Sequence, residues 1–411
     1  MGRVRERVST LYLTGAIRYA AARGDLLARL LVNRPGHDPY PLYEQVRERG
    51  VVNRSALAPV YVSASHAFVS QALRDPGLEV FDQAALPAGP VRPVEDSFLM
   101  RNRPDHARLR RLVTPWFTAK ALQHRRDALE AIAHRRLDEL GEGPFDVVQD
   151  YAVPVAVRVI CELTGLPVGE WRRLAALGGI LAVSTSNRLP TRRQHRELLL
   201  LWRDLNDYLD DTIAAGSAPE GSLVSALSDR YGGPGELTRH DLLATLGVLL
   251  IAGFETSVGL MGGMTSRFLG DPELRRGALA DREVLVPAME ESLRLEPPVQ
   301  FTARRVPRDT EVAGVALPAH SEVMLLLAGA NRDPEVFEAP GEFRPERANS
   351  RSHLAFSGGE HYCVGAGLAR LETEVALRAL FERRPGLRRA GRPRWQRAQN
   401  IRALRTLPVR V

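Results

Sequence analysis

The sequence predicts a mainly α-helical fold with a small β part, built as one large domain. Four segments repeat apolar side chains with the period of a helix, and these are ALQHRRDALEAIAHRRLDEL, VPVAVRVICELTGL, RELLLLWRDLNDYLDDTIAA and VGAGLARLETEVALRALFERR. The alternation that is typical of strands is found mainly near 301–325, where EVAGVALPAHSEVMLLL alternates around a turn. No linker rich in Gly, Ser or Pro and no internal repeat divides the 411 residues.

The N-terminal segment has a different character from the rest of the chain. MGRVRERVSTLYLTGAIRYAAA has the basic start and alanine-rich end of a signal peptide, but Arg18 interrupts its apolar run, which is too short for such a signal. We therefore interpret residues 1–35 as an amphipathic N-terminal arm and expect the main domain to span 36–411.

Composition excludes several classes of function. The chain is 44% hydrophobic and 26% charged, which is ordinary for a soluble globular enzyme. Lys120 is the one lysine, so the sequence has no GK[ST] phosphate loop. The net charge is +7, but arginines alternate with acids throughout and form no basic patch with aromatic platforms, which argues against nucleic-acid binding. Two cysteines cannot build a disulfide framework, so a reduced, cytoplasmic chain is expected.

The stretch 242–264, LLATLGVLLIAGFETSVGLMGGM, allows two interpretations. Its 23 residues carry a single charge, and this length is sufficient to span a bilayer. Glu255 lies near its middle, however, and an ionisable side chain at the centre of a bilayer is costly and rare. We favour a long helix through the core of a large domain, with Glu255 as a functional acid beside a pocket.

A further informative stretch is the glycine-rich motif FSGGEHYCVG, 356–365. Gly358 and Gly359 permit a tight loop, and a helix is predicted to begin just after Cys363. The positive end of a helix dipole and free backbone N–H groups both favour a thiolate there. Such a thiolate can be a nucleophile, a redox sensor, a metal ligand or an inert loop cysteine. His361 is too close in sequence to be the usual partner of a nucleophilic cysteine, whereas a metal held by one protein thiolate fits haem.

Cys161, on an apolar helical face, is interpreted as a buried core thiol.

This loop resembles the haem-binding loop of the cytochrome P-450 superfamily, F-x-x-G-x-H-x-C-x-G, with Ser357 at a position where glycine is frequent. The resemblance implies haem b with the Cys363 thiolate as its axial ligand. It further implies that Phe356 packs beside the thiolate, that Gly365 belongs to the cofactor loop, and that His361 reaches a haem propionate.

Other stretches resemble the same family in the same order. IAGFETS, 251–257, is similar to the central oxygen-binding helix, and the resemblance makes Glu255 and Thr256 an acid–alcohol pair that organises protons during catalysis. In EESLR, Glu291 and Arg294 share one helix face, and with Arg347 they are expected to form a buried structural triad. A buried charge must be paired, so these three side chains are expected to lie in contact.

The resemblance also assigns the groups that would bind the propionates and the substrate. His106 and Arg110 lie four residues apart in DHARLRRLV, and Arg304 and His361 complete the set. The substrate pocket is expected to be lined by the loop around 86–99, by the region 180–190, and by Val248, Ile251, Ala252, Gln300, Thr302 and Ile401. His320 stands where the family often has glycine, and histidine tolerates left-handed backbone better than most residues.

The function that the resemblance implies is that of a bacterial, soluble haem-thiolate monooxygenase of secondary metabolism. It would insert one oxygen atom from O2 into an apolar small molecule of the polyketide, terpenoid, steroid or fatty acyl type. Electrons would come from a separate ferredoxin or flavodoxin with its NAD(P)H reductase, and an acidic partner would be attracted by Arg108, Arg111, Lys120 and Arg125. Alternatives on the same scaffold are a peroxygenase or a coupling or desaturation catalyst, and outside enzymes a haem-binding sensor.

Overall fold

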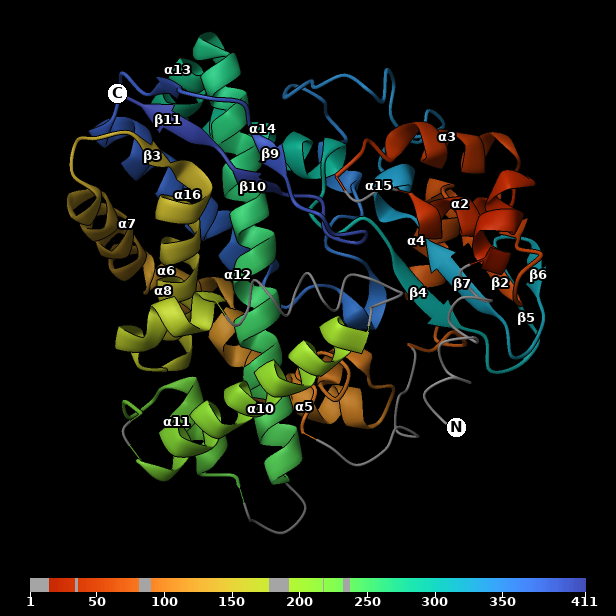
Figure 1. Cartoon of the computed structure of the whole chain (residues 1–411), viewed down its shortest axis with the longest axis horizontal. Coiled ribbons are helices and arrows are strands. Elements are labelled where there is room, and N and C mark those ends of the chain that lie inside the picture. Colours follow the sequence, from red (N-terminus) through yellow and green to blue (C-terminus); the bar gives the residue numbers. More distant parts are fainter. Residues whose placement is uncertain (1–14, 34–35, 81–89, 177–191, 217, 232–236) are drawn as a thin grey trace.

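The computed structural model describes residues 15–33, 36–80, 90–176, 192–216, 218–231 and 237–411. Within these ranges the chain is mainly helical with small sheets, which confirms the predicted fold class (Figure 1). The helices up to residue 164 are α2 (Leu26–Val32), α3 (Tyr40–Glu48), α4 (His66–Arg74), α5 (Asp105–Val113), α6 (Ala119–Gln123), α7 (Arg126–Leu140) and α8 (Val153–Thr164). Those that follow are α10 (Arg192–Ala214), α11 (Leu223–Ser228), α12 (Arg239–Gly270), α13 (Pro272–Ala280), α14 (Arg282–Leu295), α15 (Leu327–Ala330) and α16 (Ala366–Arg383).

Helix α12 is the axis of the helical part and contains the stretch 242–264. It begins at a capping box in which Thr238 accepts from the backbone of Asp241 and Asp241 accepts from the backbone of Thr238. It then runs through the core in contact with α8, α10, α14 and α16 (Figure 1). Among the described residues it is the one helix apolar and long enough to cross a bilayer, and 83% of its most apolar window is buried inside the molecule. A helix that is apolar on all sides and covered by other helices is a core helix, as we predicted.

The main sheet and a neighbouring hairpin lie on the other side of the molecule from α7 and α8 (Figure 1). Its main sheet has the order β1 (Asn53–Arg54), β2 (Val60–Ser63), β7 (Glu322–Leu325), β4 (Thr302–Arg305), in which β2 and β7 are parallel. The hairpin β5 (Thr310–Val312) and β6 (Val315–Leu317) joins β4 to β7, as the alternation near 301–325 predicts. His320, just before β7, has a φ of 63°, which lies in the left-handed region. This backbone conformation explains why glycine is frequent at the corresponding position of the family.

The remaining strands pair segments from the C-terminal end. They are β3 (Phe145–Asp146), β8 (Arg388–Arg389), β9 (Arg394–Trp395), β10 (Leu404–Thr406) and β11 (Pro408–Arg410). Strand β10 pairs with β9 and contacts α12. This places the segment 395–404 along one face of the central helix, a placement that matters below.

The N-terminal segment is partly described. Leu26 and Leu27 of α2 are buried in a cluster with Tyr43 and Val46 of α3 and Met324 of β7. Residues 1–14 lie outside the described part of the chain, and the division into an arm and a main domain at residue 36 stays a prediction.

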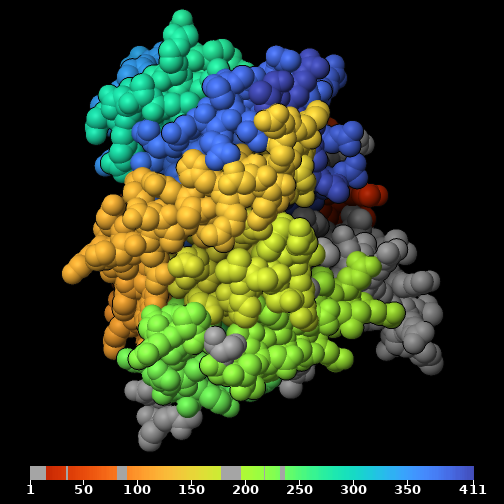
Figure 2. All heavy atoms as spheres, turned by 90° about the vertical axis from the view of Figure 1, so that its left-hand side faces the viewer, coloured from red at the N-terminus to blue at the C-terminus, as the bar shows by residue number. Residues whose placement is uncertain are grey.

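Helix α7 and the residues that follow α8 form much of one outer face of the molecule. Figure 2 shows this face, with α13 and C-terminal segments above it and the region of α10 and α11 below. Beneath this surface, Cys161 of α8 is fully buried, and burial raises its thiol pKa to about 12. A thiol with that pKa stays protonated and inert at neutral pH, in agreement with its interpretation as a core residue.

Candidate active site

The loop that carries Cys363 is held in a tight conformation. The backbone N–H of Cys363 donates to the carbonyl of Phe356 at 2.9 Å, which closes the loop before α16 begins. Gly359 has a φ of 64°, and a Cβ there would lie 2.3 Å from the carbonyl oxygen of Leu73, so only glycine fits. Ser357, at the position where the family prefers glycine, also has a left-handed φ of 62°. The loop geometry therefore explains why its pattern is rich in glycine.

Cys363 is the accessible one of the two cysteines. Its Sγ nevertheless lies deep among protein atoms, and this desolvation raises the pKa of the thiol. The backbone N–H groups of Gly365 and Ala366 and the guanidinium groups of Arg110 and Arg370 act in the opposite direction and favour the thiolate. A bound cation would strengthen the same preference, because a coordinating thiol is deprotonated outright.

A buried ionic network that the sequence did not reveal supports this loop. Glu290 of α14 accepts from Arg370 of α16 at 2.6 and 3.0 Å and lies 3.0 Å from Nε2 of His353. These partners hold the pKa of Glu290 at about 2 despite its burial. Arg370 in turn stacks 4.5 Å from the centroid of the Phe356 ring. The network thus fixes the aromatic side chain that precedes Cys363. Its only sequence signal is the first acid of EESLR, Glu290.

The three residues of the expected structural triad lie in contact. Glu291 and Arg294 are both completely buried and form a bidentate pair at 2.7 and 2.8 Å, and Nε of Arg347 lies 3.2 Å from Glu291. Arg294 also donates to the carbonyls of Asn331, Pro340 and Glu342 at 2.8 to 2.9 Å. Its guanidinium is bonded at every nitrogen, so the buried charge is fully compensated.

Four groups with basic nitrogens meet on one side of the Cys363 loop. The rings of His106 and His361 stack with centroids 4.2 Å apart, and Arg304 and Arg110 both act on His361. Burial, reinforced by these neighbours, lowers the pKa of His361 to about 3, and burial alone lowers that of Arg304 to about 10. Buried nitrogens of His106, Arg304 and His361 have no hydrogen-bond partner among the residues that the structure describes.

This cluster provides a direct test of whether the residues fit a haem. Unpartnered buried donors are costly and uncommon in a folded chain, so the cluster is complete only with an anionic partner. Haem offers two propionates, and the cluster lies next to the one accessible thiol. The donor set therefore fits the group that the loop resemblance implies.

In the middle of α12, a glycine allows close contact with α8, and two hydroxyl side chains bond to the backbone of the preceding turn. Gly253 lets α8 approach, because a Cβ there would lie 2.9 Å from Cδ1 of Ile160. Thr256 donates to the carbonyl of Ala252 at 3.2 Å, and Ser257 donates to that of Gly253 at 3.3 Å. Such bonds to the preceding turn loosen and bend helices. Ala252 is exposed and Thr256 is half-buried, so this stretch opens to solvent-accessible space.

Two acids lie on other faces of the same region and are buried. Glu255 is 5% exposed, and burial raises its pKa to about 7. Glu372 of α16 is 1% exposed, both its oxygens lack a partner, and burial raises its pKa to about 8, while the hydroxyl of Ser257 lowers it. Sequence reasoning found the first from its motif and missed the second.

Neutralising Glu372 is expected to stabilise the protein in neutral and alkaline solution. The folded-state pKa of about 8 lies above the ordinary value of 4.5, so the folded chain keeps a proton that the unfolded chain loses. Stability therefore falls as the pH rises from about 4.5 to about 8, and Glu372→Gln should remove this loss, roughly 3 kcal/mol at pH 7. Denaturant unfolding from pH 5 to 8 measures the effect.

Glu374, two residues further along α16, is the matched control. It is equally buried but pairs with Arg126 at 3.1 Å and with Arg282 at 3.2 Å. Glu374→Gln should therefore destabilise the protein at pH 7. A Glu372→Gln variant that loses stability at pH 7, as this control does, would contradict the assignment of a neutral buried acid.

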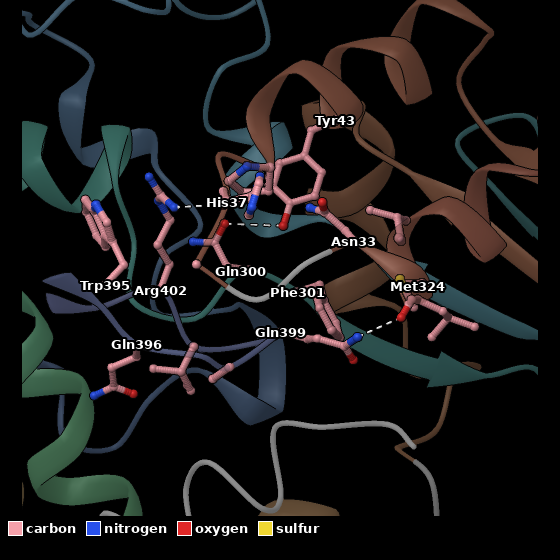
Figure 3. A pocket seen from close by; sticks show the side chains of 16 residues that line it. Asn33, His37, Tyr43, Gln300, Phe301, Met324, Trp395, Gln396, Gln399 and Arg402 are labelled. Carbon is pink, nitrogen blue, oxygen red and sulfur yellow. Dashed lines mark hydrogen bonds between the residues drawn. The ribbon is translucent and has the colours of Figure 1, made fainter. Parts of the chain in front are cut away.

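The predicted pocket residues are divided between two places. Val248 and Ile251 are buried on α12, whereas Gln300 and Ile401 line a pocket between the N-terminal helices and the segment 395–402 (Figure 3). Both ends of the Gln300 amide are hydrogen-bonded there. Its oxygen accepts from the hydroxyl of Tyr43 at 3.3 Å, and its nitrogen donates to the carbonyl of Pro297 at 2.7 Å.

Other expected pocket residues lie outside this pocket or outside the described residues. Ala252 and Thr302 are not among its lining residues. The region 180–190 and part of the loop 86–99 lie outside the described residues.

One residue of the expected docking surface is ion-paired. Arg108 pairs with Asp241 at 3.0 Å and with Asp105 at 3.4 Å, so its charge also serves the start of α12. This ion pair has no signal in the sequence, and the part of Arg108 in docking an electron donor stays a prediction. Arg111 and Lys120 are exposed, and Arg125 lies 3.8 Å from Glu162.

Comparison with known proteins agrees with this geometry. Residues 266–383 match the family model described as Cytochrome P-450. The chain is 35% identical over 430 residues to cytochrome P-450 140 of Mycobacterium tuberculosis, covering 99% of this chain and 98% of the relative. It is 37% identical over 316 residues to 6-deoxyerythronolide B hydroxylase of Saccharopolyspora erythraea, covering 75% and 76%. The ligand-free structure of Mycobacterium smegmatis CYP164A2 superposes with a TM-score of 0.82 at 32% identity, covering 94% and 99%.

The matches to cytochrome P-450 140 and to CYP164A2 extend over nearly the whole chain, and the first does so at 35% identity. Members of this family bind haem through a cysteine thiolate and use it in oxidation. The chain therefore belongs to the cytochrome P-450 family and is a haem monooxygenase.

Proposed function

We propose that this enzyme inserts one oxygen atom from O2 into an apolar small molecule, with the thiolate of Cys363 as the axial ligand of haem b. The observation that carries the proposal is the accessible thiol of Cys363 beside a cluster of buried nitrogens that have no partner in the described part of the chain. The haem, when bound, supplies the activation of dioxygen, with the thiolate favouring cleavage of the O–O bond.

The residues around the loop would hold and orient the cofactor. His106, Arg110, Arg304 and His361 would bind the propionates, for which the unpartnered nitrogens of His106, Arg304 and His361 are suited. Phe356, held by Arg370, would pack beside the thiolate, and Gly365, the N-cap residue of α16, places its N–H near Sγ. The triad of Glu291, Arg294 and Arg347 would keep the region rigid.

Protons would be managed on α12. Thr256 presents a hydroxyl at the exposed stretch, and Glu255 has a pKa near neutrality, the range in which an acid both gives up and regains protons readily. This pair would deliver protons without opening the site to bulk water.

The substrate is proposed to be an apolar small molecule of the polyketide, terpenoid, steroid or fatty acyl type. The similarity to a hydroxylase of 6-deoxyerythronolide B favours the polyketide class, and with it a place in secondary metabolism. The lining residues Val248, Ile251, Ala252, Thr302 and Ile401 would provide a largely apolar surface.

The test is turnover under labelled dioxygen. The haem-loaded enzyme, supplied with a surrogate ferredoxin, its reductase and NAD(P)H, is screened against myristic acid, testosterone and 6-deoxyerythronolide B for a spin-state shift. The compound that gives the largest shift should then gain one heavy oxygen atom per product. Product formation only with added hydrogen peroxide would instead identify a peroxygenase and contradict the proposal.

Electrons would arrive from a cytoplasmic ferredoxin or flavodoxin at the face that covers the Cys363 loop. Helix α6 lies against the start of α16, which follows this loop, since a Cβ at Gly367 would lie 3.0 Å from Leu122, and Tyr362 of the loop is exposed. Arg111 and Lys120 are exposed on this side, and an acidic partner would be steered toward them.

Reversing these two charges is expected to slow reduction by an acidic ferredoxin at low salt. Arg111→Glu/Lys120→Glu should reduce the rate by at least about ten-fold and should remove most of its dependence on ionic strength, because steering by charge is lost. Stopped-flow reduction measures both quantities. Arg276→Glu/Arg388→Glu, which reverses two exposed charges on α13 and β8, is the control. Equal rates in both double variants would mean that the donor docks elsewhere.

A further inference from the structure

The side chain of Gln396 lies against the face of α12 that carries Glu255. Gly259, one turn after Glu255, lets the segment 395–404 approach, since a Cβ there would lie 3.1 Å from Cβ of Ala403. The N–H of Gln396 donates to the carbonyl of Ala403 at 2.9 Å, which fixes its backbone in this position. Figure 3 shows the Gln396 amide directed toward the ribbon of α12.

The two side chains form a pair that lacks one hydrogen. The side chain of Gln396 lies close enough to the Glu255 carboxyl to lower the pKa of that acid. Yet Oε2 of Glu255 and Oε1 of Gln396 are both buried without a partner among the described residues. Both atoms are acceptors when the acid is ionised, so neither can satisfy the other. A proton on the carboxyl supplies the missing donor and lets the acid and the amide join through two hydrogen bonds.

Charged groups on the neighbouring elements are directed elsewhere. Glu372 of α16 faces Ser257, and Arg402 stacks on the ring of Trp395 and donates to the carbonyl of His37. Among the described residues, Gln396 is the polar side chain that acts on the Glu255 carboxyl, which otherwise experiences only burial.

We propose that Gln396 is a positioning residue that holds Glu255 in one orientation in both of its protonation states. The amide N–H donates to the carboxylate, and the amide oxygen accepts the O–H of the carboxylic acid. A primary amide carries both functions, whereas arginine only donates and an aliphatic side chain does neither. Glu255 can thus lose and regain a proton without moving, which deepens the relay role assigned to it above and rests on that proposal.

The test follows the protonation of Glu255 itself. Infrared difference spectra of the haem-loaded ferric enzyme are recorded across pH, and the carboxyl C=O band that is absent in Glu255→Gln reports its titration. Gln396→Arg should lower the midpoint by about 1 to 3, as a cation beside a carboxylate does, and Gln396→Met should raise it. Gln399→Met is the control, because Gln399 lies in the same segment and donates to the carbonyl of Leu31 instead.

Opposite shifts in the two variants would support the proposal, because general damage to the fold does not change the sign of a shift. The proposal would be overturned by an unchanged titration midpoint in Gln396→Met, or by midpoints that shift in the same direction in both variants. If Gln396→Arg does not retain haem, the midpoint of Gln396→Met alone decides. Peroxide released per NAD(P)H consumed is measured in parallel. If Glu255→Gln leaves that ratio unchanged, the relay role of Glu255 fails, and this result is independent of the infrared midpoints.

Discussion

Cys363→His is expected to abolish the red-shifted Soret band of the reduced carbon monoxide complex. That band reports a thiolate bound to the haem iron, and an imidazole nitrogen donates less electron density than a thiolate does. The loop around residue 363 should still close, because its closing bond runs from the backbone N–H of this residue to the carbonyl of Phe356. Monooxygenase activity should fall below detection, since the thiolate drives cleavage of the O–O bond.

The other cysteine is the matched control. Cys161 is buried in α8 with a pKa raised to about 12, so Cys161→Ala should keep the thiolate band and lose only some stability. If Cys363→His kept the band, Cys363 would not be the ligand. Loss of the band in both variants would point to failed haem incorporation, which the haem content of each protein reveals.

Thr256→Ala is expected to separate NAD(P)H consumption from product formation. The variant keeps the Cys363 loop and the cation cluster, so haem and substrate should bind normally. Reducing equivalents should instead appear as hydrogen peroxide, and product per NAD(P)H should fall by about ten-fold. This is less than the roughly 10²–10⁴-fold typical of a removed general acid, because water can take the place of the hydroxyl.

Ser257 offers a control within the same turn of α12. Its hydroxyl bonds the carbonyl of Gly253 just as Thr256 bonds that of Ala252, but Ser257 is buried and faces Glu372. Ser257→Ala should leave product per NAD(P)H nearly unchanged. A similar loss of coupling in both variants would mean that the bend of the helix, and not the Thr256 hydroxyl, is what matters.

Local sequence patterns predicted the features that local geometry determines. The glycines around Cys363 are required by left-handed backbone and by the approach of Leu73, and both constraints act within a short loop. The Glu291–Arg294 pair follows from a spacing of three on one helix. The long apolar stretch 242–264 predicted a core helix, because one internal acid made a membrane span costly.

Contacts between distant segments could not be predicted in this way. Glu290 meets Arg370 eighty residues later, and Gln396 meets Glu255 only because the C-terminal strands fold back along α12. Arg108 pairs with Asp241 only because the fold brings the start of α12 beside α5. In each case the residue type is common, and only the tertiary fold gives it a partner.

The scarcity of lysine has a practical consequence for the exposed face near the Cys363 loop. Lys120, the one lysine of the chain, is exposed at the start of α6, which packs against that loop. Amine-selective reagents therefore have one side chain to modify, on the side of the molecule where the thiolate lies. A dye, a tether or an electrode surface coupled through this amine would attach every molecule in the same orientation, with the cysteine loop toward the support.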